Sequence, residues 1–176
     1  MQGHLFLIGF MGAGKTAVSE VLSKMTGIPV LDTDECIRRQ EGALISEIFA
    51  EKGEAYFRDL ETQLLVRLQG MEPQIISCGG GMPLRPQNAA LMRQAGRVIW
   101  LTARPETVLE RLAGDNTRPL LAGRRNPAAV AELMDQRREA YASACSMQIS
   151  TDGRSAEEIA AEIAEMMLQD DSGLEY

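Results

Sequence analysis

The chain has 176 residues, of which 45% are hydrophobic and 24% charged, and these values fit one globular domain. Its formal net charge of −7 argues against broad electrostatic binding to nucleic acid or to an anionic membrane. The three cysteines are odd in number and widely spaced, which excludes a disulfide framework and a Cys-x-x-Cys metal site. The single histidine argues against a His-based zinc site or a Ser-His triad.

The negative charge is concentrated at one end of the chain. Residues 152–176 hold eight acids and one base, whereas residues 1–151 hold seventeen of each sign. An anion-binding site must therefore arise from local arrangement rather than from bulk charge. No apolar run reaches the roughly 20 residues that span a bilayer, and the N-terminus lacks the pattern of a secretion signal. We expect a cytoplasmic protein that binds neither membrane nor nucleic acid.

Short apolar runs alternate with helical stretches, which is typical of a parallel sheet covered on both faces. The apolar runs predict five strands, at Leu5–Gly9, Pro29–Asp32, Ile75–Cys78, Val98–Thr102 and Met147–Ser150. The helical pattern and its end signals predict helices at Thr16–Met25 and Glu54–Gln69, two that begin near Pro105 and Pro127, and a last one that begins with a capping box at Ser155. Residues 169–176 are expected to be a frayed tail.

Two stretches interrupt this alternation. Residues 34–59 fit two short helices inserted before the long helix, the second capped by Ser46. Residues 112–125 mix glycine, proline and arginine with little periodicity. Inserts of this kind are commonly lids or substrate-holding flaps, although an ordinary surface loop also explains the second one.

A phosphate-binding motif follows the first predicted strand. Residues 9–16 read Gly-Phe-Met-Gly-Ala-Gly-Lys-Thr and match Gly-x-x-x-x-Gly-Lys-[Ser/Thr] between a strand and a helix, the context of a P-loop. Backbone amides of Gly12, Ala13, Gly14 and the residues that open the helix can cradle phosphates at its positive end. Lys15 can reach the β- and γ-phosphates, and the Thr16 hydroxyl can ligate magnesium. This motif predicts a nucleotide but not a reaction.

Two further motifs end predicted strands at the edge of the sheet where ligands bind in such folds. Asp32 and Asp34 flank Thr33, and carboxylates at i and i+2 of an extended segment face the same way, one toward magnesium and one toward an acceptor. The alternative is that Asp34 caps a helix while Asp32 or Thr33 is solvated. Residues 79–81 are three glycines, which expose backbone amides to a ligand or simply make a tight turn.

Arginines occur near these motifs. Guanidinium groups bind carboxylates and phosphates bidentately, so several that converge would suit a nucleotide and a small anionic molecule, although each one alone is more often a solvated surface residue. The candidates are Arg58, Arg111, Arg118, Arg137 and Arg138.

Together these motifs resemble the shikimate kinases over nearly the whole chain. The resemblance rests on GFMGAGKT at 9–16, DTD at 32–34, SEIFAEKGEAYFRDLE at 46–61, GGG at 79–81, RPLL at 118–121 and Arg-Arg-x-x-Tyr at 137–141. It implies a three-layer α/β/α P-loop kinase fold with a five-stranded parallel sheet. It divides a single domain into a core of about 1–33, 60–111 and 126–168, a shikimate-binding insert of about 34–59, a lid of about 112–125 and the tail 169–176.

The resemblance also implies roles for individual residues. Asp34, Lys15 and Arg118 would be catalytic, and Thr16 and Asp32 would hold Mg2+. The nucleotide would be bound by Gly12, Ala13, Gly14, Lys15, Thr16, Ala17, Arg111, Arg118 and Arg154. Shikimate would be bound by Asp34, Arg58, Gly79, Gly80, Gly81 and Arg137. Glu61 lies three residues after Arg58 and is expected to fix its rotamer.

One position departs from the family pattern. The family commonly has Arg-x-Pro-x-Tyr before the last strand, and here Glu139 stands in place of the proline. Counting back four from Tyr141 selects Arg137, because Arg138 points about 100° further round a helix. Glu139 would weaken an acceptor site unless it pairs with Arg138.

The expected activity is Mg2+-dependent transfer of the ATP γ-phosphate to the 3-hydroxyl of shikimate, in chorismate and aromatic amino acid biosynthesis. The alternatives are another small-molecule P-loop kinase, for gluconate or a nucleotide, and a nucleotide-binding protein without transfer activity. ATP and shikimate are the expected partners, and the chain is expected to be a monomer.

Overall fold

A computed structural model describes residues 3–113 and 126–172 of the chain. Its centre is a five-stranded sheet in the order β2-β3-β1-β4-β5, in which every neighbouring pair is parallel. The strands are β1 His4–Ile8, β2 Val30–Asp32, β3 Ile75–Ser77, β4 Gly96–Thr102 and β5 Met147–Ser150. All five predicted strands are present, with ends that differ by two residues at most.

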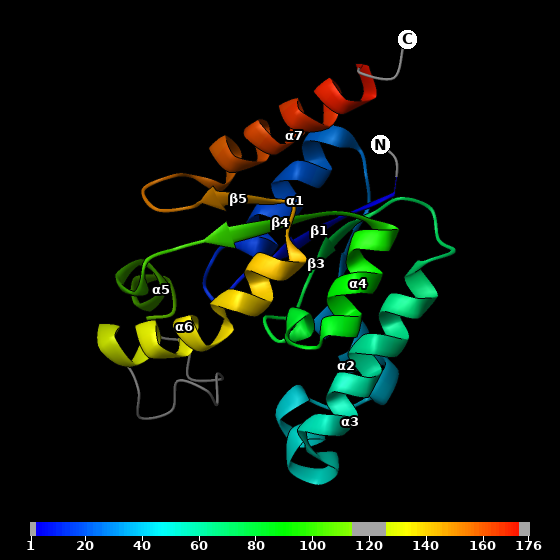
Figure 1. Cartoon of the computed structure of the whole chain (residues 1–176), viewed down its shortest axis with the longest axis vertical. Coiled ribbons are helices and arrows are strands. Elements are labelled where there is room, and N and C mark those ends of the chain that lie inside the picture. Colours follow the sequence, from blue (N-terminus) through cyan, green and yellow to red (C-terminus); the bar gives the residue numbers. More distant parts are fainter. Residues whose placement is uncertain (1–2, 114–125, 173–176) are drawn as a thin grey trace.

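Helices cover both faces of the sheet, and the side chains of β1 show how (Figure 1). Leu5 and Leu7 pack in a cluster with residues of α1 (Lys15–Thr26) and α7 (Ala156–Ser172). Phe6 and Ile8, which alternate with them, pack on the opposite face in a second cluster, with residues of α3 (Ile45–Leu68), α4 (Pro86–Ala95) and α6 (Pro127–Ala144). Because successive side chains of a strand point to opposite faces, one buried strand anchors both outer layers. The fold is the expected three-layer α/β/α arrangement.

The remaining helices lie in the connections between strands. They are α2 Thr33–Glu41, α3 Ile45–Leu68, the 3-10 helix η1 Met82–Leu84, α4 Pro86–Ala95, α5 Pro105–Arg111 and α6 Pro127–Ala144. Neither η1 nor α4 was predicted from the sequence, although Pro86 occupies the first turn of α4, as proline often does. Among the described residues, no helix is long and apolar enough to cross a membrane.

The insert after β2 has the expected helices but a different cap. Gly53, at φ 80°, interrupts α3, so α2 and the part of α3 before Gly53 correspond to the two short helices. The prediction that Ser46 caps the second of these helices was wrong. Leu44 is the N-cap residue, and its amide donates to the Glu47 carboxylate at 2.7 Å. A glutamate at this position satisfies the exposed amide without a capping hydroxyl.

The last helix begins as predicted but ends later. The Glu158 amide donates to the Ser155 hydroxyl at 3.2 Å and the Ser155 amide to the Glu158 carboxylate at 2.8 Å, which forms the capping box. Helix α7 continues to Ser172, so residues 169–172 are helical rather than frayed. Residues 173–176, and positions 114–125 of the predicted lid, lie outside the described residues.

Candidate active site

The P-loop joins the carboxyl end of β1 to the first residue of α1. Gly12 and Gly14 have φ values of 76° and 96°, which side chains with a Cβ rarely adopt, and so the loop requires glycine at both positions. The Lys15 ammonium group lies over the loop and donates to the carbonyl oxygens of Gly9 at 2.8 Å and Phe10 at 3.1 Å. Lysine and helix terminus are thus placed together, as an anion-binding loop requires.

Arg111 at the end of α5 braces this loop from outside. Its guanidinium donates to the Gly12 carbonyl oxygen at 3.1 Å, and to the hydroxyl and carbonyl oxygens of Thr151 at 2.9 and 2.8 Å. Arg111 therefore joins the P-loop to the turn after β5. Thr151 is a buried residue that the sequence analysis did not identify.

The end of β2 differs from the expected extended segment. Asp32 is the N-cap of α2 and accepts a hydrogen bond from the Glu35 amide at 3.0 Å, so the chain turns into a helix at Thr33. The prediction that Asp32 and Asp34 lie on one extended segment was therefore wrong, as was the alternative in which Asp34 caps the helix. Thr33 is fully buried rather than solvated. Asp32 ends the strand, while Asp34 projects from the first turn of α2.

The three consecutive glycines bring the predicted acceptor-binding residues together. An ideal Cβ added to Gly79 would overlap the Asp34 carboxylate, and one added to Gly81 would overlap the Arg58 guanidinium. A Cβ on Gly80 would lie 3.7 Å from both an Arg137 nitrogen and the Tyr141 hydroxyl. Three charged side chains from three helices therefore approach one turn, and at Gly79 and Gly81 they lie directly against its backbone.

Two polar residues hold this turn in place. The Thr33 hydroxyl accepts a hydrogen bond from the Gly79 amide at 2.8 Å, so that amide is already used by the protein. The Tyr141 hydroxyl donates to the Gly80 carbonyl oxygen at 2.6 Å. Burial raises the pKa of Tyr141, which keeps the phenol as a proton donor. The sequence contained Thr33 inside the DTD motif but gave no signal for its contact with a residue 46 positions away.

Glu61 forms the expected ion pair with Arg58. An Arg58 nitrogen donates to Glu61 Oε2 at 2.8 Å, and a second nitrogen donates to Glu54 at 2.9 Å. Burial raises the pKa of Glu61 to about 7, because desolvation of the carboxylate outweighs the attraction of Arg58. Within the described part of the chain, Glu61 Oε1 is buried without a hydrogen-bond partner.

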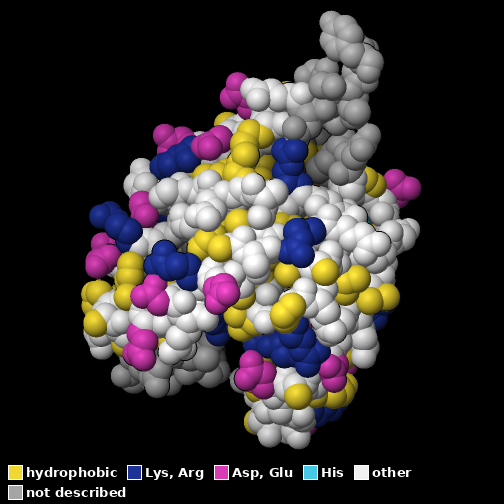
Figure 2. All heavy atoms as spheres, viewed as in Figure 1, with side chains coloured by type: hydrophobic (Ala, Val, Ile, Leu, Met, Phe, Trp, Pro, Cys, Tyr) yellow, Lys and Arg dark blue, Asp and Glu magenta, His cyan; other side chains and the backbone are white. Residues whose placement is uncertain are grey.

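Charged side chains of the P-loop, the DTD motif and α3 gather around the end of β3. Burial is the main cause of the raised pKa of the Cys78 thiol. Four nearby charges also act on this thiol, those of Lys15, Asp32, Asp34 and Glu61. The P-loop lysine thus lies on the same edge of the sheet as the two aspartates, as the topology of parallel sheets predicts. Figure 2 shows the surface hollowed beside the protruding end of the α2–α3 insert, with acidic and basic side chains interspersed on this face.

Comparison with known proteins decides the family. The family model described as shikimate kinase matches residues 11–168. The chain belongs to the shikimate kinase family. A shikimate kinase of Persephonella marina is 42% identical over 160 residues, which cover 91% of this chain and 96% of that protein. The structure of a shikimate kinase from Acinetobacter baumannii in complex with shikimate has a TM-score of 0.89 at 32% identity, over 97% of this chain and 95% of that one.

A gluconokinase from Sinorhizobium meliloti provides a contrast with these shikimate kinases. Its structure has a TM-score of 0.55 and 16% sequence identity, over 96% of this chain and 97% of that one. At that identity the likeness concerns the fold alone. It is consistent with the shared P-loop kinase architecture and gives no support for gluconate as the acceptor.

The neighbouring arginines Arg137 and Arg138 have different surroundings in this member of the shikimate kinase family. Arg137 is half-buried, lies 5.6 Å from the centre of the Phe10 ring, and donates to the Gly80 carbonyl oxygen at 3.4 Å. Arg138 is exposed and pairs with Asp135 at 2.6 Å rather than with Glu139. Arg137 is therefore the one beside the glycine turn, while its role in binding stays a prediction.

Of the other predicted nucleotide-binding arginines, the structure describes Arg154 but not Arg118. Arg154 forms an ion pair of 2.5 Å with Glu162 of α7, and its amide donates to the Thr151 carbonyl oxygen at 3.4 Å. Through Thr151, which Arg111 also contacts, it is connected to the P-loop region. Arg118 lies outside the described residues.

Proposed function

We propose that the protein transfers the γ-phosphate of ATP to the 3-hydroxyl of shikimate, producing shikimate 3-phosphate and ADP in the route to chorismate and the aromatic amino acids. The observation that carries the proposal is the glycine turn at 79–81, where Asp34, Arg58 and Arg137 meet beside a P-loop. A carboxylate and two guanidinium groups complement an acceptor that has both hydroxyls and a carboxylate. Membership of the family supports the same reaction.

The P-loop would bind the nucleotide. The backbone amides of residues 12–17 would surround the phosphates, and Lys15 would exchange its carbonyl partners for phosphate oxygens. Arg111 and Arg154 would lie toward the base end. Arg118 would add positive charge near the transferring phosphate, where it would stabilise the charge of the transition state.

Magnesium is the cofactor that we propose, and the residues fit it. Thr16 is exposed in the first turn of α1, and Asp32 is only partly buried at the end of β2, so both offer oxygen atoms at the phosphate side of the sheet. Mg2+ in kinases is commonly held by one or two protein oxygens together with substrate phosphates and water. When bound, it would neutralise charge on the β- and γ-phosphates.

The acceptor side would orient the attacking hydroxyl. Arg58 and Arg137 would hold the shikimate carboxylate, which leaves the ring hydroxyls to face Asp34. Asp34 would accept a hydrogen bond from the 3-hydroxyl and receive its proton as the oxygen attacks phosphorus in line with the departing ADP oxygen. Positioning supplies most of the rate enhancement in such a transfer.

The remaining predictions complete this proposal. The division into a core, a shikimate-binding insert at 34–59 and a lid at 112–125 would separate the acceptor side from the nucleotide side, and closure would exclude water as a competing acceptor. We propose a cytoplasmic monomer. Size-exclusion chromatography with light scattering tests the oligomeric state.

A coupled assay of ADP release tests the proposed reaction. Wild-type protein is supplied with ATP, Mg2+ and, in turn, shikimate, gluconate or a nucleoside monophosphate. The proposal expects ADP release that is stimulated by shikimate and not by the other two acceptors. A rate with shikimate no higher than the rate in water alone would refute it.

A further inference from the structure

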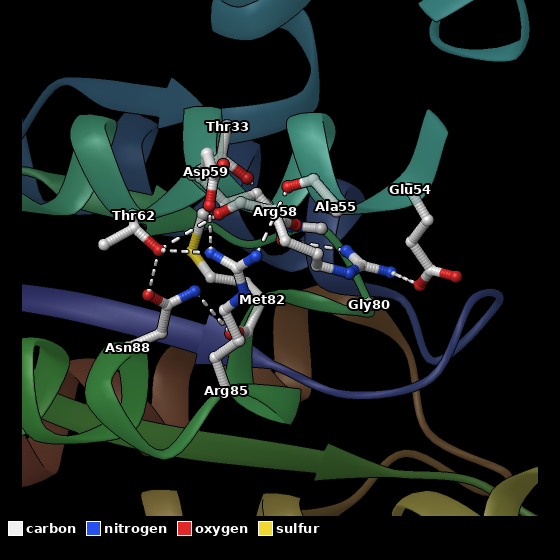
Figure 3. A network of polar contacts seen from close by, with 12 residues as sticks. Thr33, Glu54, Ala55, Arg58, Asp59, Thr62, Gly80, Met82, Arg85 and Asn88 are labelled. Carbon is white, nitrogen blue, oxygen red and sulfur yellow. Dashed lines mark hydrogen bonds and ion pairs between the residues drawn. The ribbon is translucent and has the colours of Figure 1, made fainter. Parts of the chain in front are cut away.

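A polar network that the catalytic proposal does not use joins α3 to the segment after the glycine turn (Figure 3). Arg85 is the N-cap residue of α4 and reaches across to α3. One of its terminal nitrogens donates to the Asp59 carboxylate at 2.6 Å, and the other donates to the Ala55 carbonyl oxygen at 3.3 Å. Arg85 thus contacts a side chain and the backbone of the same helix.

The second arm of the network is buried. The Asn88 side-chain amide donates to the Met82 carbonyl oxygen at 3.0 Å, and its oxygen lies 2.7 Å from the Thr62 hydroxyl. That hydroxyl also accepts from Arg85 at 3.4 Å and from Gln87 at 3.3 Å. Asn88 has no exposed surface, so each of its hydrogen bonds is costly to lose.

Both ends of the network connect to the acceptor side of the site. The Met82 amide donates to the Gly79 carbonyl oxygen at 3.0 Å and the Leu84 amide to that of Gly81 at 3.1 Å, so η1 is a hydrogen-bonded continuation of the glycine turn. On α3, Thr62 lies one turn after Arg58, and its hydroxyl is 3.0 Å from the Arg58 carbonyl oxygen. The network therefore couples the backbone that carries Arg58 to the backbone of the turn.

The spacing between these two segments has little tolerance. The Arg58 guanidinium lies so close to Gly81 that even a Cβ there would overlap it. Bidentate recognition of a carboxylate needs the guanidinium and neighbouring donors to be held to within about 0.5 Å. An outward shift of α3 by a fraction of an ångström would separate Arg58 from the turn.

We propose that Arg85 and Asn88 are positioning residues, which fix the distance between Arg58 and the Gly79–Gly81 turn and thereby set the affinity for the acceptor carboxylate. This inference rests on the proposed function. Arg85 is partly exposed and Asp59 is exposed, so their ion pair contributes little to folding. The effect of Arg85 is on geometry at the site rather than on global stability.

Arg85→Met tests this inference, with Arg67→Met as its matched control. Arg67 lies on α3, the helix that Arg85 contacts; it is exposed and donates to Gln40 of α2 at 2.7 Å, so its replacement also removes an arginine hydrogen bond between two elements. We expect Arg85→Met to raise the KM for shikimate about tenfold while the KM for ATP changes less than about twofold. Arg67→Met should leave both constants unchanged.

A double-mutant cycle identifies the route of the effect. If Arg85 acts through Arg58, then adding Arg85→Met to an Arg58→Ala protein will change the KM for shikimate by less than about twofold. Arg85→Lys should restore part of the affinity, because lysine keeps the charge opposite Asp59 but not the second hydrogen bond.

The outcomes separate this inference from the proposed function. An active wild-type enzyme in which Arg85→Met leaves the shikimate KM unchanged, or raises both KM values equally, overturns the positioning role alone. A full tenfold loss in the Arg58→Ala background overturns it as well, since the effect then does not pass through Arg58. Wild-type protein that releases no ADP with shikimate overturns both proposals.

Discussion

Gly81→Ala tests the contact between the glycine turn and Arg58 most selectively. Gly81 has φ −94° and ψ −9°, close to the third position of a type I turn, which residues with a Cβ also adopt. The three heavy atoms nearest to the added methyl group would all be terminal atoms of Arg58. The substitution therefore changes the position of one guanidinium and leaves the backbone as it is.

The size of the effect follows from the overlap. Carbon and nitrogen atoms in ordinary contact lie about 3.5 Å apart, so the guanidinium must retreat by roughly 1 Å to admit the methyl group. A displacement of that size at a substrate-positioning group costs about 100-fold in rate. We expect kcat/KM for shikimate to fall by about that factor, which corresponds to roughly 2.7 kcal/mol of transition-state stabilisation.

Steady-state kinetics with each substrate varied in turn provide the assay. The KM for ATP should stay within about twofold of wild type, because the atoms nearest to the methyl group belong to Arg58 rather than to the P-loop. Gly70→Ala is the matched control: a Cβ at Gly70 meets nothing within 4 Å, and no loss is expected. Gly80→Ala should cost less than Gly81→Ala, since its nearest neighbour would be 3.5 Å away. An unchanged kcat/KM for shikimate in Gly81→Ala would refute the assignment of Arg58 to the acceptor site.

Two other predictions concern stability. Because burial raises the pKa of Glu61 from 4.5 to about 7, the native state keeps a proton that the unfolded chain releases; this stabilisation is complete below pH 4.5 and is lost as the pH rises through 7. Urea unfolding should therefore show wild type losing up to about 3 kcal/mol relative to Glu61→Gln between pH 5 and 8, and parallel pH profiles would contradict the shifted pKa. Tyr141→Phe removes the hydrogen bond to Gly80 and should lower the free energy of unfolding by about 1 kcal/mol, whereas an unchanged midpoint would show that the bond contributes nothing.

Local pattern was sufficient to predict the sheet and the P-loop. Strands β1 and β3 are short, mostly apolar runs in which every residue is buried, and the phosphate loop is a contiguous motif whose glycines have the required φ values. Both signals lie within a few consecutive residues, where periodicity and backbone preference are directly visible. The capping box at Ser155 was predicted correctly for the same reason.

The errors arose where one element gives way to another. The spacing of Asp32 and Asp34 suggested a continuous strand, but Asp32 caps a helix that begins at the next residue. A capping aspartate and a ligand aspartate look identical in sequence, since both end an apolar run. Helix α4 was missed because the glycines at 79–81 indicated only exposed amides or a tight turn, and no helix was looked for after them.

The polar contacts that support the site were outside the reach of sequence reasoning. Thr33 meets Gly79 across 46 positions, and Arg85 meets Asp59 across 26. Each residue alone has the properties of an ordinary surface or cap residue, and only the packing of α2, α3 and α4 brings the partners together. The Arg58–Glu61 pair was predictable because it lies within one helical turn.

Identification of the product tests the central claim most directly. Wild-type protein, ATP, Mg2+ and shikimate are incubated together, and the mixture is followed by 31P NMR. We predict a new phosphomonoester signal coupled to the proton on carbon 3 of shikimate, which grows in equal amount with ADP. Formation of ADP and inorganic phosphate without that signal, or no consumption of ATP, would contradict the account.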